Sequence, residues 1–108
     1  MGFNMQKLMK QAQKMQQEMN KAQEELKNTQ VEGISGGGMV KVLASCNNEV
    51  LSIAIDPEIV DPEDVEMLED LVLAAVKDAL EKAAATAAAR MQSVTGGMGM
   101  GGGFPGMF

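Results

Sequence analysis

The chain has 108 residues, a net charge of −6 and no histidine, tyrosine or tryptophan. This length allows one domain at most, and the missing residue types exclude most acid–base and nucleophilic catalysis, because Lys and carboxylates would have to act alone. The thin supply of large side chains predicts a small core, and burial between subunits is a usual remedy, so we expect an oligomer.

The first predicted element is an amphipathic helix from Met5 to about Asn28, roughly 24 residues and 36 Å long. Apolar residues recur along it at alternating spacings of three and four, which is a heptad pattern. We call this row the heptad seam: Met5, Leu8, Ala12, Met15, Met19, Ala22 and Leu26. The chain shows neither a signal-peptide core at its start nor a run of about 18 apolar residues, so we expect neither secretion nor membrane insertion.

Four lysines lie on the other side of this helix. At 100° per residue they fall within about 60° of one another and nearly opposite the heptad seam. We call them the lysine stripe: Lys7, Lys10, Lys14 and Lys21. The sequence pattern alone does not distinguish a solvated face from a phosphate-binding face. The alignment of the lysines on one stripe favours phosphate binding, because each contact with a phosphate releases counterions. Without aromatic residues beside the stripe, contact with a duplex backbone is favoured over base stacking.

The middle of the chain predicts a three-stranded antiparallel meander. Alternating apolar residues indicate half-buried strands at 29–35, 40–44 and 50–55. Gly36–Gly38 joins the first two strands, and Asn47-Asn48 suits the tight turn between the last two. Three strands leave free edges, which dimerisation can remove.

A second, longer helix is predicted after the strands. Asp61 is the expected N-cap and Pro62 the expected first helical residue, and the helix should run to about Val94, roughly 32 residues and 48 Å. A sheet of about 20 Å is too short to cover it, so its alanine-rich half should project and pack against the heptad seam. The apolar positions are Val65, Leu68, Val72, Ala75, Val76, Ala79, Ala83 and Ala87. Residues 96–108 are dominated by Gly, so we expect a flexible tail after a single domain at 1–95.

Three other patterns favour structure over chemistry. The glycines at 33 and 36–38 lack the Lys-Ser/Thr of a phosphate-binding loop and precede a strand, so they predict a turn. Eight carboxylates and no basic residue lie between Asp56 and Asp70; they suit a helix N-terminus, and the spacing of a calcium loop is missing. The single cysteine, Cys46, excludes an intrachain disulfide and fits a small core residue in a reducing compartment. We therefore expect no metal, cofactor, small-molecule substrate or enzymatic activity.

Several segments of the chain together match the sequence pattern of a known family. They are KLMKQAQKMQQEM, GISGGGMVKV, SIAIDPEIVDPEDVEMLEDLVLAAVKDAL, MQSVTGG and a late Phe-Pro-Gly. Together they resemble the YbaB/EbfC family of bacterial nucleoid-associated DNA-binding proteins over nearly the whole chain. The resemblance implies a cytoplasmic homodimer with antiparallel sheet at the subunit junction and paired helices projecting like tweezers, which binds DNA and alters its shape in the nucleoid. It also implies a gene often placed beside recombination-repair genes.

The sequence thus predicts an α+β fold that dimerises through the sheet region and carries projecting helical arms. The first functional hypothesis is a non-enzymatic, nucleoid-associated homodimer that binds duplex DNA mainly through backbone phosphates, alters its conformation and influences nucleoid organisation and gene expression. The lysine stripe is the expected contact surface, with Lys82 and Arg90 as further candidates. The alternative is a helical protein–protein interaction module, in which the heptad seam docks another protein through Met15 and Met19.

Overall fold

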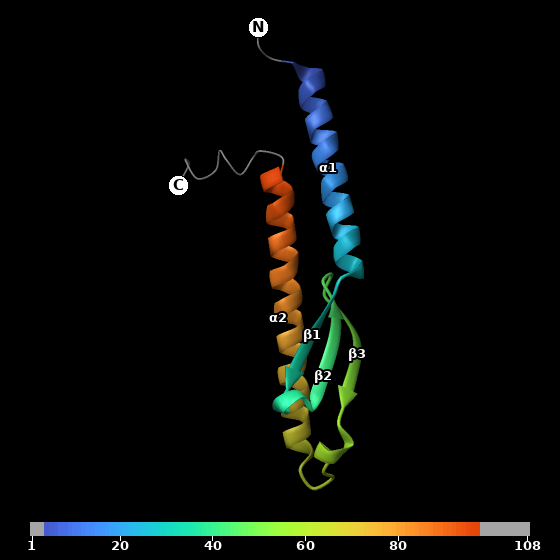
Figure 1. Cartoon of the computed structure of the whole chain (residues 1–108), viewed down its shortest axis with the longest axis vertical. Coiled ribbons are helices and arrows are strands. Elements are labelled where there is room, and N and C mark those ends of the chain that lie inside the picture. Colours follow the sequence, from blue (N-terminus) through green and yellow to red (C-terminus); the bar gives the residue numbers. More distant parts are fainter. Residues whose placement is uncertain (1–3, 98–108) are drawn as a thin grey trace, which may run out of the picture.

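Two antiparallel helices and a three-stranded sheet make up the computed structural model, which describes residues 4–97 (Figure 1). The predicted order of elements, helix, three strands and long helix, is confirmed. The turn predicted at Gly36–Gly38 is present as a short 3-10 turn, and a second 3-10 turn, at Pro57–Ile59, was not predicted. The elements are α1 (Met5–Asn28), β1 (Gln30–Ser35), β2 (Val40–Ser45), β3 (Glu49–Ile55) and α2 (Val65–Gly97).

The sheet is the predicted antiparallel meander, in the order β1-β2-β3. Gly33 pairs with Val42, and Val42 pairs with Ile53. The turn between β2 and β3 places Asn48 at a φ of 69°, a left-handed conformation that asparagine tolerates better than most residues. A β-bulge interrupts the pairing of these two strands at Leu43 and Ala44.

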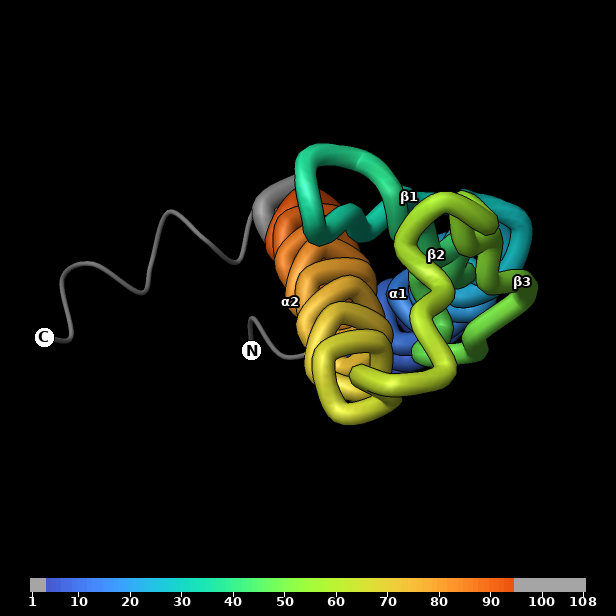
Figure 2. The backbone as a smooth tube through the Cα atoms, turned by 90° about the horizontal axis from the view of Figure 1, so that it is seen from below, coloured from blue at the N-terminus to red at the C-terminus, as the bar shows by residue number. Residues whose placement is uncertain are grey.

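The main core lies between α2 and the first two strands. Val40, Val42 and Ala44 of β2 are fully buried against Ala75 and Ala79 of α2. Figure 2, a view along the length of the molecule, shows α2 on one side and β3 as the strand that lies farthest from it. The alanines let the helix approach the sheet closely, because their side chains end at Cβ.

A second cluster joins the end of α1 to α2 and to the end of β2. Leu26, Cys46 and Ala83 are buried together. The Cys46 N–H donates hydrogen bonds to the carbonyl oxygens of Leu26 and Thr29, at 3.1 Å and 2.9 Å. The expectation that Cys46 is a small core residue is therefore confirmed, and the buried contact fixes where α1 leaves the sheet.

The beginning and end of α2 differ from the prediction. Asp61 is not its N-cap: the Asp61 side chain accepts the Glu63 N–H at 2.9 Å, and Asp64 accepts the Met67 N–H at 3.2 Å. Asp61 therefore shapes the preceding turn, and the helix begins at Val65 rather than Pro62. At the other end α2 includes the glycines at 96–97, which were assigned to the tail; the remainder of that predicted tail, 98–108, lies outside the described residues.

The prediction that all three strands are half-buried is wrong for β3. All seven of its residues are exposed, because the single helix α2 packs on β1 and β2. Val50, Ile53 and Ile55 pair with buried residues of β2, so their side chains point to the helix-covered side of the sheet without being covered. An apolar strip is left open beside α2.

Candidate nucleic-acid interface

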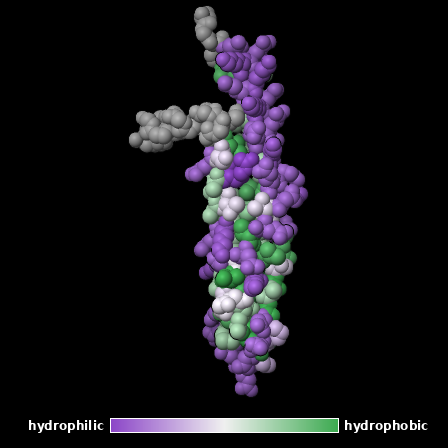
Figure 3. Space-filling model, viewed as in Figure 1, coloured by the Kyte–Doolittle hydropathy of each residue, from purple (hydrophilic) through white to green (hydrophobic). Residues whose placement is uncertain are grey.

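The lysine stripe lies on the outer face of α1. The helix begins at an N-cap, where the Asn4 side chain accepts the Lys7 N–H at 3.1 Å. Ala22 and Leu26 of the heptad seam are buried, which fixes the inner face of α1. All four lysines of the stripe are exposed, as expected for residues on the opposite side of the helix. On the face of the molecule seen in Figure 1, Figure 3 shows hydrophilic side chains along most of the α1 arm.

The ammonium groups of the stripe are available to external anions. Within residues 4–97 the ion pairs are Lys82 with Asp78 and Arg90 with Glu25, so no described carboxylate pairs with a lysine of the stripe. From Lys7 to Lys21 the stripe covers 14 residues of helix, which is about 21 Å at 1.5 Å per residue. This row of positive charges, which form no salt bridge within residues 4–97, is the strongest candidate for a functional surface.

Lys82 does not join the lysine stripe. Its Nζ lies 3.1 Å from Asp78 Oδ2 and donates to the Glu32 carbonyl oxygen at 2.9 Å. Asp78 also accepts the Ile34 N–H at 3.0 Å, and this bond, followed by that from Lys82, lowers the pKa of the Asp78 carboxyl. Lys82 and Asp78 thus fasten α2 to the outer edge of β1.

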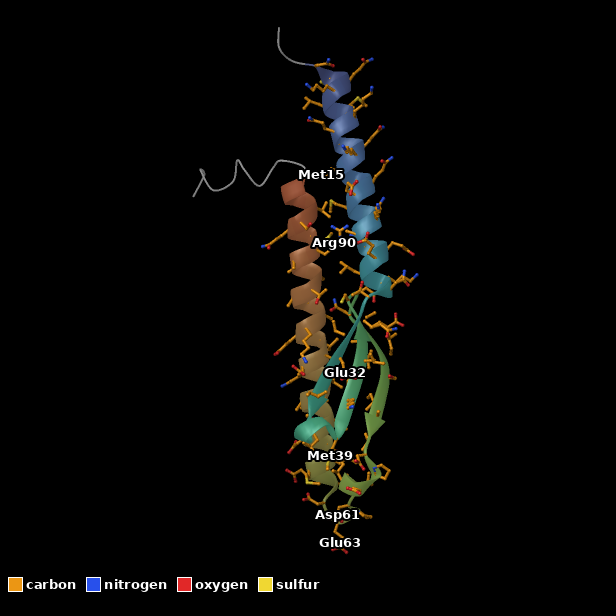
Figure 4. All side chains as sticks on the ribbon, viewed as in Figure 1. Met15, Glu32, Met39, Asp61, Glu63 and Arg90 are labelled. Carbon is orange, nitrogen blue, oxygen red and sulfur yellow. The ribbon has the colours of Figure 1, made fainter. Side chains whose placement is uncertain are left out.

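Arg90 lies at the junction of the two helices (Figure 4). Its Nε donates to Glu25 Oε2 at 2.8 Å. This hydrogen bond lowers the pKa of Glu25 and raises that of Arg90. Arg90 therefore links α2 to α1, and a phosphate would have to compete with Glu25 for it.

Positive and negative charge lie at opposite ends of the long axis. From Met5 to Lys21 the chain carries four Lys and one Glu, a net +3, whereas 56–70 carries eight carboxylates and no base. Figure 4 shows Asp61 and Glu63 at the end farthest from the α1 arm. The molecule is 76 Å long, several times the Debye length of about 8 Å in physiological salt. The acidic segment therefore repels a polyanion at the arm only weakly, despite the net charge of −6.

Other surfaces offer little chemistry. An open hollow of about 510 Å³ lies beside the end of α1, and its lining is Asn20, Gln23, Glu24, Lys27 and Asn47. In the described part of the chain, no three His, Cys, Asp or Glu residues are grouped as metal ligands. Of the helices within 4–97, none is both long and apolar enough to cross a membrane.

Comparison with known proteins gives matches to one protein family that cover most or all of the chain. A family model described as the YbaB/EbfC DNA-binding family matches residues 1–98. A nucleoid-associated protein of Desulforamulus reducens is 55% identical over 108 residues, covering 100% of this chain and 99% of its own. A protein of the same name from Ruminiclostridium cellulolyticum is 52% identical over 107 residues, with 99% and 90% covered. The crystal structure of the uncharacterized protein HP0035 from Helicobacter pylori has a TM-score of 0.65 and 26% identity, over 75% of this chain and 85% of that one.

Proposed function

The chain belongs to the YbaB/EbfC DNA-binding family, and on this basis we propose that it is a nucleoid-associated protein that binds duplex DNA mainly through backbone phosphates. The observation that carries the proposal is the lysine stripe, exposed along α1 and free of ion pairs within residues 4–97. Phosphates attract such a row through counterion release, which makes binding strongly salt-dependent.

The length and chemistry of the stripe suit a DNA backbone. About 21 Å of helix corresponds to the rise of about six base pairs. Lysine contacts phosphate as a point charge, and the stripe includes neither the Arg or Asn pairs that read base edges nor aromatic side chains for stacking. We therefore expect weak preference among DNA sequences.

The proposal includes a homodimer joined near β3. Val50, Ile53 and Ile55 leave an exposed apolar strip beside α2. Asp78 and Lys82 occupy the edge of β1, whereas no side chain of the described residues does the same for the outer edge of β3. A second copy at β3 would bury the strip and hold two α1 arms at a fixed separation.

Two arms at a fixed separation favour DNA that is bent to meet both. Such proteins alter DNA conformation without catalysis, since the cost of bending is offset by the added phosphate contacts. The relatives named nucleoid-associated proteins support a place at the nucleoid in the cytoplasm. We further propose that DNA bending there influences nucleoid organisation and gene expression. No enzymatic step is part of this proposal.

A gel-shift assay with unrelated duplexes at two salt concentrations tests the stripe. The variant Lys10→Glu with Lys14→Glu reverses two charges in its centre. We expect DNA affinity to fall at least about tenfold and the slope of log affinity against log salt to fall by about two for each arm that touches DNA.

The matched control is Lys41→Glu with Lys77→Glu. Both lysines are exposed and lie on β2 and α2, away from the stripe, and the pair changes the net charge by the same amount. Equal losses of DNA affinity in the two variants would contradict a defined contact surface, because the loss would then depend on the net charge of the protein and not on the position of the lysines. An unchanged affinity in the Lys10 and Lys14 variant would refute the stripe itself.

A further inference from the structure

The N-terminal part of α1 extends past the end of α2. Figure 1 shows the overhang, and Figure 4 places Met15 beside the C-terminal end of α2. The heptad seam continues along the overhang, but its burial does not. Met5 is 60% exposed and Leu8 46%, whereas Leu26 at the covered end of the seam is 7% exposed.

The exposed part of the seam forms one apolar strip. Met5, Leu8 and Ala12 point in directions within about 60° of one another, and Met9, also exposed, lies next to them. We call these four residues the overhang strip. It faces away from the lysine stripe, which is on the opposite side of α1. A contiguous apolar strip on a helix of otherwise polar residues is typical of a docking surface.

The chain itself supplies a suitable partner immediately after α2. The eleven residues 98–108 read MGMGGGFPGMF, and their large side chains are all Met or Phe. Phe104 follows Gly97 by seven residues, which can extend about 23 Å. The overhang from Met15 to Met5 is ten residues of helix, or about 15 Å. Phe104 can therefore reach every position of the overhang strip.

We propose that residues 98–108 bind the overhang strip of their own chain through Met and Phe side chains. The tether favours this occupant over another molecule, since a short linker gives an effective concentration in the millimolar range. Methionine sulfur also packs favourably against an aromatic ring, and the strip offers two methionines to Phe104. The tail would lie on the face of α1 opposite the lysine stripe, so the stripe stays accessible and the proposal is independent of DNA binding.

A tryptophan at position 104 reports on this contact. The natural chain has no tryptophan or tyrosine, so the variant Phe104→Trp in the full chain has one dominant fluorophore. We expect its emission at a shorter wavelength than in the urea-unfolded chain. Adding Met5→Gln and Met9→Gln should return the emission to the unfolded wavelength, because the strip loses its apolar side chains.

The matched control adds Met39→Gln and Met67→Gln to the same tryptophan variant. Both methionines are 38% exposed and lie toward the other end of the molecule, so the emission should stay at the shorter wavelength. Emission like that of the unfolded chain in the Phe104→Trp protein overturns the proposal. An equal shift in the control variant overturns it as well, because the environment of position 104 would then not depend on the strip.

Hydrogen exchange separates the tail from other occupants. We expect the amides of residues 8–14 to exchange severalfold faster in Phe104→Gln with Met100→Gln than in the natural chain, at any protein concentration. If the protection of these amides is the same in both proteins and increases with protein concentration, a second copy of the chain covers the overhang strip. Equal and unprotected exchange in both proteins would leave the strip to a different protein. Either result refutes docking of the tail.

Discussion

Gly33 lies where β1 crosses α2, and a side chain there would push the two elements apart. A Cβ at this position would lie 2.3 Å from the carbonyl oxygen of Ala75 and 2.3 Å from the nitrogen of Ala79. Both are backbone atoms of a helix and cannot rotate away. We expect Gly33→Ala to lower the free energy of unfolding by about 3 kcal/mol or more, the upper part of the range for overpacking. Urea unfolding followed by circular dichroism measures the loss.

Gly37→Ala is the matched control for Gly33→Ala. A Cβ on Gly37 would have no atom within 4 Å, but its φ is 67°, so Gly37→Ala should cost only the left-handed backbone strain of about 1–2 kcal/mol. A loss for Gly33→Ala no larger than this would show that β1 and α2 separate at little cost. The close approach of strand and helix would then not be a rigid feature of the fold.

At the scale of elements, α1 and α2 pair through small side chains. Ala22 of α1 is fully buried, whereas Ala12, ten residues earlier on the same seam, is exposed on the overhang. Leucine at 22 would overpack the contact between the helices, so Ala22→Leu should lower the free energy of unfolding by about 2 kcal/mol. Ala12→Leu adds the same atoms to the same helix and should change it by less than about 0.5 kcal/mol. Thermal unfolding of both variants checks this, and equal effects would contradict the alignment of the two helices.

The bounds of α1 and the strands were predictable because they depend on local chemistry. The heptad seam marks α1, and Asn48 suits the left-handed turn whatever surrounds it. The start of α2 was not predictable, because Asp61 and Asp64 are both good N-cap residues and the sequence does not decide between them. Hydrogen bonds to Glu63 and Met67 show how the structure uses each.

The candidate surface was predictable to a similar degree. The lysine stripe follows from helical periodicity, so its exposure could be foreseen. The partners of Lys82 and Arg90 could not, because Asp78 with β1 and Glu25 on α1 meet them only in the folded chain. Periodicity also does not say which strands one helix covers, and so the exposure of β3 was missed. The overhang, by contrast, follows from the predicted helix lengths. About 28 Å of α2 extends beyond a sheet of about 20 Å, and an α1 of about 36 Å is longer than that part of α2.

At the scale of the whole molecule, the open face of β3 predicts where two copies meet. Ile53 and Ile34 are similarly exposed, at 47% and 46%, but Ile53 lies on the helix-covered side of the sheet and Ile34 on the other side. Sedimentation equilibrium should give the mass of two chains for the natural protein and for Ile34→Lys. Ile53→Lys should give the mass of one chain, because a lysine there would bury a charge between the copies. Dissociation by Ile34→Lys alone would move the interface to the opposite face, and a natural protein with the mass of one chain would exclude the dimer.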